Sequence, residues 1–126
     1  MRAVAVAGLV LLAGCGDGTG TGGGIYSCAE GAPGGDGGAG TPEVCIEVMG
    51  GTAQDLANNQ SSCAAAHASF AFAPCSHTGA LGGCREALAG SAITTWYYQG
   101  TMTVSDVQMT CAQAASSGLP VQFVSP

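Results

Sequence analysis

The sequence predicts a small α+β domain that three disulfides hold together. The prediction rests on short segments of alternating apolar and polar residues, on two threonine-capped helical stretches, and on six cysteines within residues 25–126. Six cysteines in a small exported domain favour disulfides over a metal cluster, and no C-x-x-C pair occurs here. Both halves show the order strand, strand, helix, strand, which predicts two diverged units of that kind.

The N-terminus carries the pattern of an export signal. Arg2 is followed by an apolar run over residues 3–12, too short to span a bilayer as a helix, and by Leu12-Ala13-Gly14-Cys15. The last four residues resemble the lipobox of bacterial lipoproteins. That resemblance implies a signal peptide over 1–14 and a Cys15 that is acylated, palmitate included, and becomes the first mature residue. The alternative is an ordinary signal peptide cut elsewhere, although Ala5-Val6-Ala7 lies too early for that.

Composition restricts the partners. Cleavage before Cys15 removes Arg2 and leaves Arg85 against eight carboxylates, a formal net charge of −7, and the chain has no lysine. Nucleic-acid binding needs clustered basic residues, so it is excluded as a function class. A basic patch on anionic lipid is excluded for the same reason. We therefore expect membrane attachment through N-terminal acyl chains alone. If the protein binds a partner rather than simply coating the surface, we expect an envelope protein or a glycan.

The first half of the chain begins with a glycine-rich tether over residues 15–24, and the folded domain is expected over 25–126. Strands are predicted at 25–28 and 43–48. Thr52-Ala53-Gln54-Asp55 resembles a capping box and predicts a helix to about His67. Phe70 and Phe72 alternate with alanines and predict a strand over 69–73 with both rings pointing inward.

The second half follows the same order. A turn is predicted at 79–83, a strand at 84–88, and a hairpin turn at Gly90-Ser91 that leads into a strand over 92–99. Thr103-Val104-Ser105-Asp106 is a second capping signal, and its helix should end at Ser117-Gly118. The last strand is predicted over 121–124.

Alignment of the two halves predicts the disulfides. Strand cysteines Cys28 and Cys84 correspond, as do helix cysteines Cys63 and Cys111, which follow their caps by 11 and 8 residues and so face nearly the same way. Residues 70–72 align with 121–123, and Tyr97 and Ser125 fall near the positions of Cys45 and Cys75. Chance similarity of the two cap signals is the alternative to a repeat. If the repeat is real, the pairs are Cys28–Cys63, Cys84–Cys111 and Cys45–Cys75.

The motifs together resemble a family. The lipobox, the glycine-rich tether, Tyr26-Ser27-Cys28, Gly82-Gly83-Cys84, Trp96-Tyr97-Tyr98 and a cysteine-bearing helix are similar to the small cysteine-rich lipoproteins of high-GC bacteria. Those proteins have no assigned function, so the resemblance implies an architecture and a place in the cell envelope, outside the cytoplasm. Asp17, two residues after Cys15, bears on the choice of membrane, and we expect the outer rather than the inner one.

Chemistry is sparse. His67 and His77 are the only histidines, and no spacing of a zinc protease, serine-hydrolase elbow or P-loop occurs. We expect no catalytic residue, metal or cofactor, and a non-catalytic binding or surface-coat module. The alternatives are a small hydrolase that uses carboxylates such as Glu30 and Glu86 or uses His77, and a metal-binding envelope protein. Trp96 and Tyr98 share one strand face, which is either core or an exposed binding surface for sugars or a partner.

Overall fold

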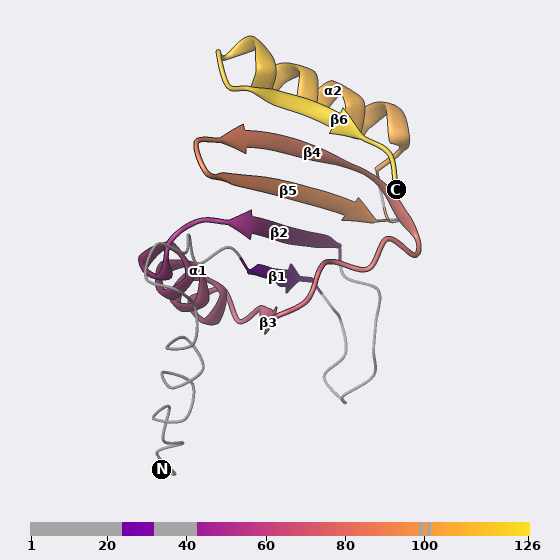
Figure 1. Cartoon of the computed structure of the whole chain (residues 1–126). Helices are drawn as coiled ribbons and strands as arrows, with labels where there is room; N and C mark the ends of the chain where they lie inside the picture. The colour runs from indigo at the N-terminus through magenta and orange to yellow at the C-terminus, as the bar shows by residue number, and fades with distance from the viewer. Residues whose placement is uncertain (1–23, 32–42, 99, 101) are drawn as a thin grey trace.

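An antiparallel sheet of six strands in the order β3-β1-β2-β5-β4-β6 forms the centre of the domain (Figure 1). The computed structural model describes residues 24–31, 43–98, 100 and 102–126. The predicted signal peptide, Cys15 and nearly all of the tether lie outside these residues. The elements are β1 (Ile25–Glu30), β2 (Val44–Gly50), α1 (Ala53–Ala65), β3 (Ser69–Ala71), β4 (Ala80–Leu88), β5 (Ser91–Tyr98), α2 (Val104–Ser116) and β6 (Val121–Val124).

The two predicted units are related by an approximate twofold axis through the middle of the sheet. Strands β2 and β5 pair antiparallel there, with Ile46 opposite Thr95. One strand further out, Ile46 is paired with Cys28 and Thr95 with Cys84. At the edges, Cys28 is paired with Phe70 on β3 and Cys84 with Phe123 on β6. One row of side chains therefore crosses the sheet as Phe-Cys-Ile-Thr-Cys-Phe, and the axis passes between Ile46 and Thr95.

Both helices begin as the sequence predicts. The Asp55 carboxylate accepts the Thr52 backbone N–H at 2.8 Å, while Asp55 N–H donates to the Thr52 hydroxyl at 3.2 Å. Thr103 and Asp106 form the same reciprocal box at 2.8 and 3.3 Å. Each box satisfies two backbone donors that a helix N-terminus leaves without an intrahelical partner.

The helices also end alike. His67 follows α1 with a φ of 54°, and Gly118 follows α2 with a φ of 92°. His67 N–H donates to the Ala64 carbonyl and Ala68 N–H to the Cys63 carbonyl, which is the hydrogen-bond pattern of a Schellman motif. A left-handed residue is required at this point of the chain, and only the second unit uses glycine for it.

The disulfides are Cys28–Cys63, Cys45–Cys75 and Cys84–Cys111, the three pairs that the repeat predicts. Two of them bond a helix to the first strand of its own unit. The strand cysteines of these two disulfides, Cys28 and Cys84, both lie in the row of side chains that crosses the sheet through Ile46 and Thr95. Three disulfides indicate an oxidising, extracytoplasmic location. None of the helices in the described part of the chain has the length and hydropathy of a membrane span.

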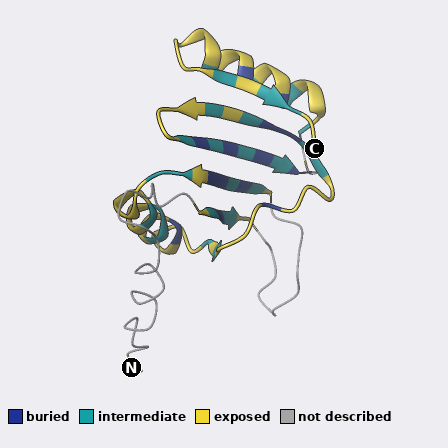
Figure 2. Cartoon of the chain, viewed as in Figure 1, coloured by how far each residue is buried: buried dark blue, intermediate teal, exposed yellow. Residues whose placement is uncertain are grey.

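The two faces of the sheet are covered differently. The helix face carries α1 over one half and α2 over the other, because Cys28 and Cys84 point to this side. Residues 72–79, which we call the strap, lead from β3 to β4 and cover part of the opposite face, the strap face (Figure 1). Buried and less buried residues alternate along β5, as Figure 2 shows. The buried cluster under the strap consists of Cys45, Cys75, Trp96 and Tyr98.

Some sequence expectations were wrong in detail. The predicted turn at 79–83 is largely strand, since β4 begins at Ala80 with an irregular register between Ala80 and Gly82. Glycine is needed at 82 because an added Cβ would lie 2.4 Å from the Phe123 ring. Phe72 does not point inward: β3 ends at Ala71, and Phe72 is 57% exposed.

The predicted alignment of the halves also needs correction in two places. By strand pairing, the counterpart of Phe123 is Phe70 rather than Phe72. The twofold axis makes Thr94 the counterpart of Cys45, where the alignment placed Tyr97 nearby. The two units differ in the lengths of their links, so an alignment from motifs alone slips by a few residues.

Candidate ligand groove

The proposed aromatic binding surface is not on the outside of the molecule. Trp96 and Tyr98 are 4% and 3% exposed, so the alternative in which they are core is correct. The His77 ring lies over Trp96 with its centroid 4.1 Å away, and the Tyr98 hydroxyl donates to the Ser76 carbonyl. The strap covers both aromatic residues and prevents them from contacting a sugar or a partner.

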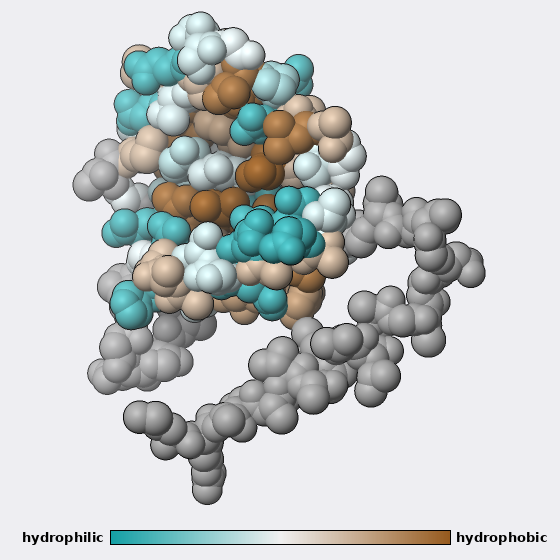
Figure 3. All heavy atoms as spheres, turned by 90° about the vertical axis from the view of Figure 1, so that its left-hand side faces the viewer, coloured by the Kyte–Doolittle hydropathy of each residue, from teal (hydrophilic) through white to brown (hydrophobic). Residues whose placement is uncertain are grey.

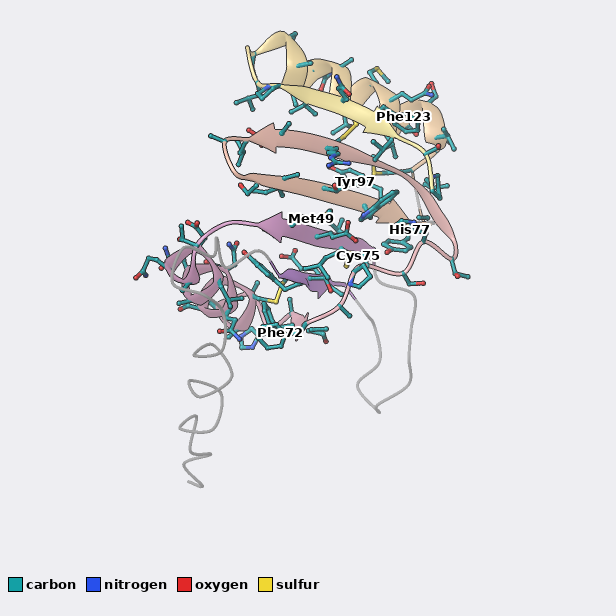
Figure 4. All side chains as sticks on the ribbon, viewed as in Figure 1. Met49, Phe72, Cys75, His77, Tyr97 and Phe123 are labelled. Atoms are coloured by element: carbon teal, nitrogen blue, oxygen red, sulfur yellow. A yellow bond between two sulfur atoms is a disulfide. The ribbon has the colours of Figure 1, made fainter. Side chains whose placement is uncertain are left out.

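A buried carboxylate fixes the strap. Glu47 on β2 is 7% exposed, and its carboxylate accepts the Cys75 backbone N–H at 2.9 Å. Burial raises the pKa of the Tyr98 hydroxyl, and the nearby Glu47 charge raises it further. Figure 4 shows Cys75 and His77 close together at this end of the sheet. These groups serve to hold the strap in place.

The helix face carries three neighbouring pockets along the central strands. One is a pocket of about 80 Å³ between α1 and the sheet, lined by Tyr26, Ile46, Asn59 and Phe70 among others. A pocket of about 130 Å³ adjoins it, with Tyr26, Val48 and Asn59 lining both. A third pocket, of about 170 Å³ beside α2, shares Ile93 with the second. We call this connected surface the groove.

The two ends of the groove are built from equivalent residues. Glu30 lines the pocket beside α1, and Glu86, its counterpart two residues after the strand cysteine, lines the pocket beside α2. Asn59 and Thr110 each lie seven residues after their helix cap and line the same two pockets. The groove is therefore a product of the repeat, with one half contributed by each unit.

The two halves of the groove floor differ in which of two paired strands carries the large side chain. Tyr26 on β1 is paired with Val48, whereas Gly82 on β4 is paired with Tyr97. A tyrosine thus stands on the outer strand in one unit and on the central strand in the other. Phe70 stacks on Tyr26 at 5.6 Å between ring centroids, while Phe123 packs against the space that Gly82 leaves.

Polar groups stand above this apolar floor. Asn59 Nδ2 donates to the Tyr26 hydroxyl oxygen at 2.9 Å and to the Asp55 carbonyl at 2.8 Å. Burial raises the pKa of Tyr26, and the Asn59 hydrogen bond partly opposes that shift. The Tyr26 hydroxyl is therefore neutral at ordinary pH and sits at the junction of two pockets, where it can donate its proton to a ligand.

The charged groups that line the groove are all carboxylates, namely Glu30, Asp55 and Glu86. Hydrogen bonds from the backbone N–H and the hydroxyl of Thr52 hold the pKa of Asp55 below its usual value, so it is ionised. Arg85, the sole cation among residues 25–126, is adjacent to Glu86 on β4 and therefore points to the strap face. The groove is acidic.

The candidate catalytic residues are not brought together. Glu30 and Glu86 are three strands apart and belong to different rows, about 20 Å from each other, which is beyond the separation of a glycosidase pair. His77 lies on the strap face. Every cysteine that the structure describes is in a disulfide. Within the described ranges no three side chains of the His, Cys, Asp or Glu type gather as metal ligands would.

Sequence reasoning did not find the groove. Its lining residues are ordinary strand and helix residues such as Val48, Asn59 and Ile93, and they come together only through the pairing of β2 with β5. The one available signal was the predicted repeat, because duplicated helices on one face of a sheet leave the central strands between them. No protein-family model, no curated protein and no solved structure matches this chain.

Proposed function

We propose that the chain is a lipid-anchored, non-catalytic binding protein of the bacterial cell envelope, and that the groove is its ligand site. The observation that carries the proposal is the continuous groove itself, with an apolar floor and hydrogen-bonding groups above it. Small-ligand and peptide sites commonly combine an apolar lining with a few hydrogen-bonding groups in this way. The three disulfides agree with an extracytoplasmic place of action.

The lipid anchor is the second part of the proposal, and it rests on Leu12-Ala13-Gly14-Cys15. Cys15→Ser should abolish incorporation of labelled palmitate and partition into detergent. Cys28→Ser serves as the matched control, because it removes a sulfur without touching the acylation site. Unchanged labelling of the Cys15→Ser protein would contradict the anchor. If the anchor is confirmed, separation of inner and outer membranes tests the expected outer-membrane placement.

The ligand site is testable in intact cells with a photo-reactive benzoylphenylalanine. Tyr97 lies on the groove floor, and Gln122 lies exposed on the strap face of β6. We expect a discrete adduct with an envelope protein or glycan from position 97 and none from position 122. The adduct should disappear when Thr95→Arg fills the groove. Equal adducts from both positions, or none from position 97, would contradict the groove as the site.

A further inference from the structure

Three links of the chain, with the ends of the elements that they join, meet at the end of the sheet where the chain enters the domain. They are residues 49–54 at the passage from β2 to α1, 87–91 at the turn from β4 to β5, and 117–120 between α2 and β6. The Gly51 N–H donates to the Gly90 carbonyl at 3.2 Å, and the Ala87 N–H donates to the Pro120 carbonyl at 3.3 Å. We call these three links together the tether end.

The three links are largely apolar, and the Asp55 carboxylate stands beside them, because its Oδ2 would lie 3.4 Å from a Cβ added at Gly51. Met49, Leu88 and Leu119 are 44%, 43% and 48% exposed, and they are half of the large exposed hydrophobic residues of the described chain. None of the residues in the three links is Asp, Glu, Lys or Arg. Figure 3 views the molecule from this side and shows hydrophobic atoms in its middle with hydrophilic atoms around them. Leu88 and Leu119 line the groove on the helix face and Met49 lies on the strap face, so the three side chains flank this end of the sheet. Exposed apolar side chains gathered in this way are typical of an interaction surface.

The acyl chains cannot be far from this end. The Gly50 N–H donates to the Gly24 carbonyl at 3.2 Å, so the chain enters the domain beside the first of the three links. Cys15 precedes Gly24 by nine residues, and a glycine-rich segment of that length has an r.m.s. span of about 15–18 Å. An anchored domain therefore stays within a short distance of the bilayer.

Electrostatics favours one orientation at that distance. The domain is acidic, and anionic headgroups repel carboxylates. Glu30 and Glu43 stand at the opposite end of the sheet, where the Glu43 N–H donates to the Glu30 carbonyl. An orientation with the tether end toward the membrane keeps Glu30 and Glu43 away from the headgroups, although Asp55 is on the near side, and it places Met49, Leu88 and Leu119 against the lipid.

We propose that the tether end is a second membrane contact, in which Leu88, Leu119 and Met49 enter the interfacial region of the bilayer. The proposal rests on the lipid anchor of the proposed function and adds an orientation to it. Apolar side chains that reach the acyl boundary gain the free energy of burial without any basic residue. Because Leu88 and Leu119 also line the groove, this orientation brings one side of the groove next to the membrane.

The test uses the full acylated chain in phosphatidylcholine–phosphatidylglycerol vesicles with brominated acyl chains, which quench tryptophan that enters the bilayer. Leu119→Trp places a reporter at the tether end, and Ser125→Trp places a matched reporter beyond β6 at the opposite end. We expect bromolipid to remove most of the added emission of Leu119→Trp and none of that of Ser125→Trp. Leu88→Glu added to Leu119→Trp should restore the emission.

The outcomes separate the two proposals. Mass spectrometry of each protein establishes whether Cys15 is acylated. An acylated Leu119→Trp protein without quenching, or with quenching equal to that of Ser125→Trp, overturns the membrane contact and leaves the anchor standing. A chain that carries no acyl group overturns the anchor, and the membrane contact falls with it.

Discussion

Ile46 and Thr95 face each other directly across the β2–β5 pair, and each is the counterpart of the other in the repeat. On each side of this pair the sheet continues with the same features: a cysteine on the next strand, a phenylalanine on the edge strand, and a helix bonded to that cysteine. The groove lies over this pair because the duplicated helices stand to either side of it. The same symmetry supplies natural controls for the predictions below, since most substitutions have a counterpart in the other unit.

The two helix disulfides should not be equivalent. Cys63 is the only buried residue of α1, whereas α2 buries both Val107 and Cys111. Cys28→Ala with Cys63→Ala should therefore release α1 locally, while Cys84→Ala with Cys111→Ala should leave α2 docked. Each double variant should lose about 3–4 kcal/mol of stability, given loops of 35 and 27 residues. Hydrogen exchange of the helix amides measures the difference, and equal protection of α1 and α2 in their respective variants would contradict it.

His67→Gly should stabilise the protein. His67 adopts a φ of 54°, a left-handed conformation that costs a residue with a Cβ about 1–2 kcal/mol. Glycine avoids that cost but loses more backbone entropy on folding, so the net gain should be about 1 kcal/mol. Urea unfolding measures it. Gly118→Ala, the reverse change at the equivalent position of the second unit, should destabilise. A loss of stability in His67→Gly would show that the imidazole contributes more than the strain costs.

Acid should weaken both helix N-termini. Hydrogen bonds from the Thr52 backbone and hydroxyl lower the pKa of Asp55, and those from the Thr103 hydroxyl and backbone lower that of Asp106, from an ordinary 3.8. Because the folded pKa lies below the unfolded one, this contribution is complete above about pH 4 and is lost as the pH falls through the folded value. Asp55→Asn with Asp106→Asn should flatten the acid limb of a stability profile recorded by urea unfolding. If the loss of stability at low pH were unchanged in this double variant, the acid sensitivity would come from other carboxylates.

The domain should lack hydrolytic activity. Residues 25–126, with their disulfides formed, should not hydrolyse generic ester, peptide, phosphate or glycoside substrates, because Glu30, Glu86 and His77 do not converge. Turnover of any of these substrates that disappears in His77→Ala or Glu86→Gln would overturn the binding-protein proposal in favour of the hydrolase. Arg85→Gln, on the opposite face from Glu86, controls for a general loss of stability.

The amino-acid sequence determined what is local and what is repeated. Reciprocal Thr–Asp caps at residues 52–55 and 103–106 predict the starts of the two helices. A capping box can be recognised in the sequence because it is a contact between residues only three apart. The cysteine pairing also followed from the chain alone, since two copies of one unit must place Cys28 and Cys84 alike. The lipobox prediction also rests on the sequence alone, and Cys15 lies outside the described residues.

Tertiary structure alone decided which surfaces are available. Trp96 and Tyr98 alternate with Tyr97 along β5, and alternation fixes that they share a face but not which face is covered. The strap buries them through Cys45–Cys75 and Glu47, contacts 28 to 30 residues apart in sequence. Groove and tether end likewise arise from the pairing of β2 with β5 and from links that meet only in space. Exposure is a property of what packs on a strand, and a strand's own sequence does not contain its neighbours.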